Sequence, residues 1–271
     1  MKENKTANRH MYQAGIIGNC SYIAHVDINS NISWLCWPSF EDSFVFGGLI
    51  DKNQGGCFVV KPEEEIVETK QYYIKNSNIL CTEIHTESFA YRITDFAPRF
   101  EQFGRYFKPL MLIRKIEPLR GAPSVNIQCQ PTGNYGRNRL KATRGSNHIL
   151  YSSADIGERI RLTTDVPISH FFQDEGWTII SENKYLILTY DAAFESAIAS
   201  TCEDFLQKTL SYWQRWIKHC SIPNIYQKEV IRSALVLKLH QYEDTGAIIA
   251  ASTTSLPEFP GSGRNWDYRY C

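Results

Sequence analysis

The sequence predicts a β-rich fold, a two-sheet sandwich over residues 1–195, followed by an α-helical region. Many short runs of alternating or β-branched residues lie between Ile16 and Tyr190. Clusters of Asn, Ser, Gly and Glu separate these runs, and no long helical repeat interrupts them. After Tyr190 the hydrophobic period changes from two to about 3.6 residues. Short strands without intervening helices are typical of two antiparallel sheets packed face to face.

The first predicted strands form a β-hairpin. Ala24 and Val26 alternate with polar residues, the alternation resumes at Ile32 and Trp34, and Asn29-Ser30-Asn31 supplies the turn. The remaining predicted strands share the same alternation or a β-branched composition. They lie at residues 57–60, 79–84, 91–96, 111–116, 125–129, 149–152, 159–162, 177–180 and 185–190.

Two helices are predicted within residues 202–243. Leu206, Leu210, Trp213 and Ile217 follow one another at i, i+4, i+7 and i+11, which is the apolar stripe of an amphipathic helix, and Thr201 is the expected N-cap. Residues 221–224 break this pattern, and a second helix is predicted from about residue 226 to residue 242. The Thr-Gly pair at 245–246 is a helix stop signal.

Two helices and a loop cannot enclose a core of their own. The sequence reaches Cys271 directly after an aromatic and charged cluster, so we expect the helical region to be cut within a domain. On this expectation Trp213, Leu235 and Leu237 lack partners and leave apolar surface exposed.

The composition is that of a globular protein without a strong electrostatic preference. Lys and Arg total 29 and Asp and Glu total 29, so the formal net charge is zero and nothing indicates nucleic acid or an acidic membrane as a partner. No run of eighteen apolar residues suggests a membrane span, and no apolar run near the start suggests a secretory signal. We therefore predict a cytoplasmic protein.

The eight cysteines predict neither a metal site nor a disulfide framework. No two form a C-x-x-C pair, and none has a histidine at zinc-finger spacing. Cys36, Cys57 and Cys129 occupy apolar strand positions and are expected to be reduced and buried. No cofactor is predicted.

The densest polar and aromatic stretch runs from residue 253 to residue 270. Loops of this composition often line sites, and sugars require flat apolar surfaces together with hydrogen-bonding groups. Trp266, Asp267, Tyr268 and Arg269 supply both. The alternative is a surface loop held by an Asp–Arg pair.

Elsewhere the polar residues favour structural roles. Glu41, Asp42 and Asp95 could pair for acid–base chemistry, but each lies beside a strand end or turn, where carboxylates cap backbone donors. The basic run, Arg137, Arg139, Lys141 and Arg144, is expected on a solvated hairpin. No self-contained catalytic set is predicted.

Several segments, in order along nearly the whole chain, resemble glycoside hydrolase family 15, which contains glucoamylase-like and trehalase-like proteins. The segments that carry the resemblance are residues 17–20, 25–27, 32–38, 51–56, 94–96, 114–121, 231–235, 245–251, 253–258 and 264–271. The resemblance implies an N-terminal β-sandwich over 1–195, a helical linker over 196–224, and the start of a truncated (α/α)6 catalytic barrel over 225–271.

The family also implies inverting hydrolysis by two glutamates, one the general acid and one the general base. Both are expected beyond Cys271, so no catalytic residue is assigned in this chain and it is expected to be inactive alone. By the motif match Tyr268 faces the first sugar subsite, with Trp266 and Asp267 beside it.

The expected function is therefore that of the N-terminal part of an exo-acting hydrolase that releases glucose from α-glucans. A trehalase of the same family is the first alternative. A non-catalytic packing or sugar-binding sandwich is the second, and a decayed gene product is the third. The expected partner is a glucan or glucoside, and the sequence does not indicate an oligomeric state.

Overall fold

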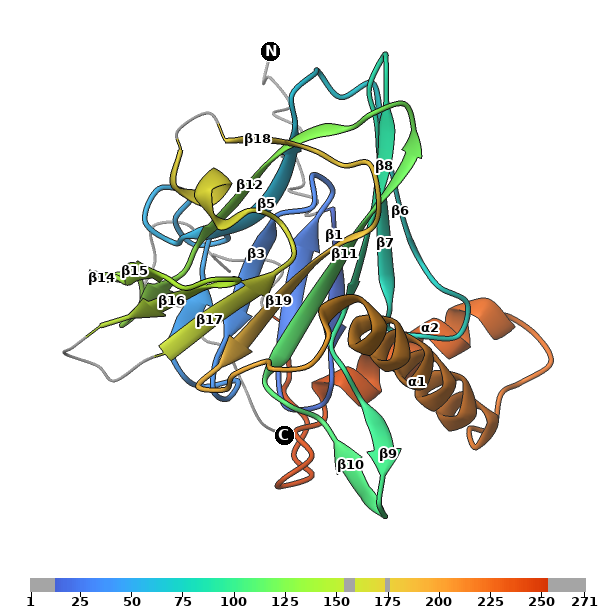
Figure 1. Ribbon diagram of the computed structural model, residues 1–271. Helices are drawn as coiled ribbons and strands as arrows, with labels where there is room; N and C mark the ends of the chain where they lie inside the picture. Colours follow the sequence, from blue (N-terminus) through green and yellow to red (C-terminus); the bar gives the residue numbers. More distant parts are fainter. Residues whose placement is uncertain (1–12, 154–158, 174–175, 253–271) are drawn as a thin grey trace, which may run out of the picture.

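The computed structural model describes residues 13–153, 159–173 and 176–252. Within this part, the chain forms a β-sandwich with two α-helices packed on one side (Figure 1). Every pairing between the named strands is antiparallel. The predicted β-rich sandwich is confirmed.

One layer is an eight-stranded sheet with the order β15-β16-β17-β19-β11-β8-β7-β6. Its strands are β6 (Glu68–Tyr73), β7 (Leu80–His85), β8 (Ala90–Phe96), β11 (Met111–Arg120), β15 (Lys141–Arg144), β16 (His148–Ser152), β17 (Arg159–Thr164) and β19 (Lys184–Tyr190). Side chains of a strand alternate between its two faces. Leu112 and Leu186 therefore enter the sandwich core, whereas Ile113 and Ile187 face the opposite side.

The facing layer is divided into smaller sheets, where the sequence predicted one. A four-stranded sheet has the order β1-β2-β3-β4, and a three-stranded sheet has the order β18-β12-β5. Two short hairpins, β9-β10 and β13-β14, complete the strands. The bounds are β1 (Ala14–Gly18), β2 (Ile23–Asp27), β3 (Ile32–Cys36), β4 (Phe44–Phe46), β5 (Cys57–Pro62), β9 (Phe100–Gln102), β10 (Arg105–Phe107), β12 (Ser124–Gln130), β13 (Thr132–Gly133), β14 (Asn138–Arg139) and β18 (Trp177–Ile179).

A single apolar core joins the layers. Ile17, Trp37 and Phe58 from the smaller sheets and their flanks pack in one cluster with Tyr91 and Leu162 of the eight-stranded sheet. A short 3-10 helix, η1 (Ile168–Phe172), closes one end of this core with Ile168 and its two phenylalanines.

The helices are α1 (Ile198–Lys218) and α2 (Gln227–His240). The predicted N-cap, Thr201, is wrong: α1 begins one turn earlier, after Ala197, so Thr201 lies inside the helix. Leu206 of α1 packs on the outer face of the eight-stranded sheet. Neither helix is both long and apolar enough to cross a membrane, as far as the described residues go.

The predicted exposure of the helical face is largely wrong. Trp213 is 0% exposed and Leu235 is 2% exposed, because both pack with Ile16 and Ile23 of the four-stranded sheet. Leu237 is 62% exposed, as predicted. Apolar residues of both helices and of the four-stranded sheet thus pack in one cluster.

The cysteines are confirmed as unpaired in the part of the chain that is described, where all seven are free thiols. Cys36 and Cys129 are buried as predicted. Cys57 is only partly buried, so that expectation is wrong. It is the first residue of β5, at the edge of the buried run Phe58–Val60, and is therefore less enclosed than the strand interior.

Candidate functional site

The predicted sugar-facing residues Trp266, Asp267 and Tyr268 lie outside the described residues, which end at Ser252. The last described residues, 249–252, contact the sandwich and α2. The amide of Ile249 donates to the carbonyl oxygen of His240 at 3.0 Å, and Ile249 is buried. Ala251 and Ser252 border a small hollow of about 20 Å³. The other residues around it are Ile23, Trp34, Cys36, Phe40 and Ile249.

A buried arginine holds the turn that follows α2. Arg99 is 1% exposed and forms an ion pair with Glu243. Its Nη1 donates to the carbonyl oxygen of Asn19 at 2.8 Å. Its guanidinium carbon lies 4.9 Å from the ring centre of Tyr106 and 4.8 Å from that of Tyr212. One side chain therefore contacts the β1–β2 turn, the β9-β10 hairpin, α1 and the segment after α2.

The β1–β2 turn completes this arrangement. Cys20 has a φ of 68°, in the left-handed region. The amide of Glu243 donates to the Cys20 carbonyl at 3.0 Å, and the Cys20 thiol donates to the carbonyl of Lys238 at 3.2 Å. We call Asn19, Cys20, Arg99, Tyr212 and Glu243 the junction cluster.

The protonation states of the buried groups in this region favour a structural role over a catalytic one. Burial raises the pKa of the Cys20 thiol, so no thiolate nucleophile is available there at neutral pH. Burial also raises the pKa of Tyr212 to about 12, which keeps the phenol protonated. His25 is completely buried nearby, and burial lowers its pKa to about 4, with the main chain at Ser252 acting in the opposite direction. A histidine without solvent access has no route to a substrate.

Two of the three carboxylates considered from sequence have structural roles. Asp95 lies within the sandwich core and forms an ion pair with Arg114, both fully buried, with 2.7 Å between Oδ1 and Nε. Asp42 accepts hydrogen bonds from the amide and hydroxyl of Ser39, at 3.0 and 2.6 Å, and so caps the β3–β4 loop. Glu41, in the same loop, is exposed.

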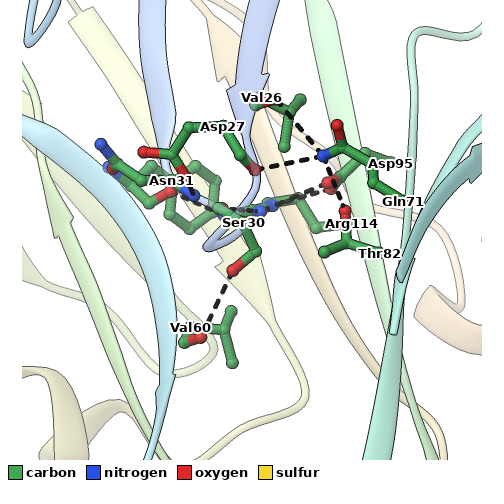
Figure 2. Close-up of polar contacts among 10 residues, drawn as sticks. Val26, Asp27, Ser30, Asn31, Val60, Gln71, Thr82, Asp95 and Arg114 are labelled. Atoms are coloured by element: carbon green, nitrogen blue, oxygen red, sulfur yellow. Dashed lines mark hydrogen bonds and ion pairs between the residues drawn. The ribbon is translucent and has the colours of Figure 1, made fainter. Parts of the chain in front are cut away.

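Figure 2 shows how Arg114 joins the sheets from the centre of the sandwich. From β11 it donates to the carbonyl oxygen of Ser30 in the β2–β3 turn, and its Nη1 donates to that of Phe58 on β5 at 2.7 Å. Gln71 on β6 adds a second contact between the sheets, because its side-chain amide donates to the carbonyl oxygen of Asp27 on β2 at 3.1 Å. The eight-stranded, four-stranded and three-stranded sheets thus share one buried charged centre.

The sequence contains no local signal for the ion pairs of Arg99, Arg114 and Glu243. Each lies in a different segment from its partners, and no local spacing marks a buried ion pair. Among the residues that the structure describes, no three His, Cys, Asp or Glu side chains converge as a metal site. The basic run lies on β14, β15 and the turn before them, largely exposed, as expected.

Removing Glu243 should test whether the junction cluster fixes the path toward residue 253. Glu243→Ala leaves the buried Arg99 charge without its carboxylate, so we expect a loss of about 2–3 kcal/mol in the free energy of unfolding. We also expect faster hydrogen exchange at the amides of Tyr242 and Ile249. The control is Asp244→Ala, which removes a partner of Lys108 that is 58% exposed and should cost less than about 1 kcal/mol. Equal effects of the two changes would contradict a special role for Arg99.

Comparison with known proteins identifies the family. The family described as "Trehalase-like, N-terminal" matches residues 5–156. A trehalase of Thermoplasma volcanium is 32% identical over an alignment of 270 positions, and the match covers 94% of this chain and 41% of that protein. A trehalase of Thermoplasma acidophilum is 32% identical over 258 residues, covering 90% of this chain and 42% of that protein. A trehalase of Mycolicibacterium smegmatis is 28% identical over 281 residues, covering 94% and 42%.

The chain therefore spans about two fifths of the length of the curated relatives that it matches. The matched family domain covers more than half of the chain, including β1 to β12 and most of the eight-stranded sheet. The chain belongs to the trehalase-like family through this N-terminal domain.

Proposed function

We propose that the chain is the N-terminal portion of a glycoside hydrolase that acts on trehalose. The observation that carries the proposal is the similarity to proteins named trehalase over 90–94% of this chain. The α-glucan specificity expected first from the sequence gains no support from these relatives. The trehalase alternative therefore becomes the preferred substrate assignment.

In this proposal residues 1–195 form the supporting sandwich, residues 196–224 the linker, and residues 225–271 the start of an (α/α)6 catalytic barrel. The family-15 resemblance supplies the chemistry: inversion by a general acid and a general base whose carboxyl groups lie roughly 6.5–9.5 Å apart. Both glutamates would come from sequence that follows residue 271. Tyr268, Trp266 and Asp267 would contact the first sugar ring.

The described residues support this proposal by positioning. The junction cluster fixes the segment after α2 to the sandwich, and residues 249, 251 and 252 lie beside residues of β2 and β3. Fixing residues 249–252 limits where the following segment can begin. Correct placement of substrate contacts is itself a large part of catalysis.

The 271-residue chain by itself should not hydrolyse trehalose. In this proposal both catalytic glutamates lie in sequence that follows residue 271. Asp95, one of the carboxylates considered from sequence, is held in a buried ion pair. Purified chain incubated with trehalose or maltotriose should release glucose at the level of a buffer blank. Release above the blank that Asp267→Asn abolishes would show that the catalytic set lies within this chain.

To test the substrate assignment, the DNA that follows codon 271 in the gene should be sequenced. An open frame there should be expressed together with residues 1–271 and assayed on trehalose and on maltotriose. We expect glucose mainly from trehalose, and strong loss of activity in Tyr268→Ala. Preference for maltotriose would contradict the trehalose proposal, and a stop codon directly after codon 271 would contradict the assignment as part of a hydrolase.

A further inference from the structure

A second concave site lies on the opposite side of the sandwich from the junction cluster. It is a cavity of about 250 Å³ where the turn before β5, the end of β12, the β14–β15 segment, β16 and η1 meet. Figure 1 shows β14–β16 and η1 on the side of the molecule away from α1 and α2. We call it the rim pocket. Its principal lining residues are Asn53, Gln130, Arg139, Tyr151, Phe171 and Phe172.

The lining combines aromatic rings with uncharged hydrogen-bonding groups. Tyr151, Phe171 and Phe172 provide apolar surface, and the amides of Asn53 and Gln130 can both donate and accept, as sugar hydroxyls do. Among the residues that the structure describes, none of the side chains that line the cavity is a carboxylate. Of the described lining residues, Arg139 carries a charged side chain, and this residue is exposed.

The walls of the rim pocket are held in place by their own contacts. The Tyr151 hydroxyl donates to the carbonyl of Cys129 at 2.9 Å, which fixes the ring that forms the floor. The guanidinium carbon of Arg144 lies 4.0 Å from the ring centre of Phe172 and covers one side of it.

The two backbone walls also touch. Gly56 has a φ of 72°, and a Cβ there would lie 2.3 Å from the carbonyl oxygen of Gln130, so the turn and the end of β12 are in direct contact. The cavity is therefore a feature of the folded sandwich, built from buried and mutually bonded groups at its base.

The size of the cavity limits the ligand. Sites for drug-sized molecules measure about 300–1,000 Å³, and the rim pocket falls just below that range. A single six-membered sugar ring has the required size, apolar ring faces for the aromatic side chains, and hydroxyls for the amides. We propose that the rim pocket binds one neutral pyranose unit, a free hexose or the end unit of a glucoside. This inference goes beyond the proposed function, because no residue of 253–271 takes part.

Binding should be measured on the 271-residue chain with methyl α-D-glucopyranoside and with trehalose, by isothermal titration and by saturation-transfer NMR. We expect millimolar dissociation constants and saturation transfer to the sugar-ring protons. Gln130→Ala and Arg139→Ala change exposed side chains and should each weaken binding about ten-fold, the effect of losing one good hydrogen bond. Phe171→Leu keeps apolar volume but removes a ring, and should reduce saturation transfer.

Matched controls lie on the β9-β10 hairpin, at the other end of the molecule. Gln102→Ala, Arg105→Ala and Phe103→Ala remove the same residue types from exposed positions and should leave binding unchanged. Trp266→Ala separates the rim pocket from the proposed sugar-contacting loop. Binding that survives Trp266→Ala but is lost in Gln130→Ala and Arg139→Ala supports the proposal, whatever the outcome for trehalose hydrolysis.

Three results would overturn it. The first is the absence of measurable binding by the folded chain. The second is binding that Trp266→Ala abolishes and the rim-pocket variants leave intact. The third is tighter binding of glucose 6-phosphate than of the neutral glucoside, lost in Arg139→Ala, because that pattern would identify a site for anions.

Discussion

Replacing Asp95 with asparagine should lower the free energy of unfolding by about 3–5 kcal/mol, the usual cost of leaving a buried charge without its partner. Asp95 and Arg114 are both 0% exposed, and the Arg114 guanidinium also lies 4.8 Å from the ring centre of Phe58. Burial raises the pKa of Asp95, and the nearby Arg114 acts against that shift. Asparagine keeps the shape of the side chain but removes the charge that compensates Arg114. Urea unfolding with linear extrapolation measures the loss.

Removing both charges should not restore stability. Arg114 also donates to the carbonyl oxygens of Ser30 and Phe58, and in Asp95→Leu with Arg114→Met both carbonyls lose a buried donor. We expect the double variant to remain destabilised by at least about 2 kcal/mol.

The control is Arg92→Met on the same sheet, which breaks the pair with Glu83 where Arg92 is 31% exposed and should cost about 1 kcal/mol or less. A double variant as stable as the parent, or an equal cost for Arg92→Met, would contradict the role assigned to Arg114.

The second large effect is a loss of stability in mild acid that depends on His25. Burial lowers the pKa of His25 to about 4 in the folded chain, against an ordinary value near 6.5. Protonation therefore favours the unfolded chain, and the stability conferred by the neutral ring is fully present above pH 6.5 and is lost as the pH falls from 6.5 toward 4. Two and a half pH units correspond to at most about 3 kcal/mol.

The measurement is urea unfolding at half-unit steps from pH 7.5 to pH 4.5, for the parent chain and for His25→Gln. We expect the two curves of stability against pH to converge in acid, because glutamine cannot take up the proton. His148→Gln is the comparison: burial also lowers the pKa of His148, but this side chain is only partly buried, so the change in slope should be smaller. Parallel curves for the parent chain and His25→Gln would show that His25 does not titrate with unfolding.

Local patterns in the sequence were sufficient for most of the strands and for both helices. The β2–β3 hairpin was predictable because side chains alternate along a strand and turn formers mark its end, and both signals lie within a few residues. The stripe of Leu206 and Trp213 predicted α1 for the same reason. The edge strand β6 was missed, because its sequence, ETKQYY, is mostly polar and carries no apolar alternation.

The candidate site was divided between sequence and structure. The resemblance indicated Trp266, Asp267 and Tyr268 as sugar contacts, and these lie outside the described residues. The structure showed the junction cluster, the packing of residues 249–252 and the separate rim pocket. None of these could be read from spacing, since each combines side chains from four or five distant segments.

Tertiary packing alone decided which charges and apolar side chains are buried. Trp213 and Leu235 were expected to be exposed, but the outer side of the four-stranded sheet covers them. Asp95 looked like one more turn carboxylate until Arg114, on the neighbouring strand, was placed beside it. Periodicity determines how a segment folds because it depends on adjacent residues, whereas burial and ion pairing depend on which distant surfaces meet, and no single segment contains that information.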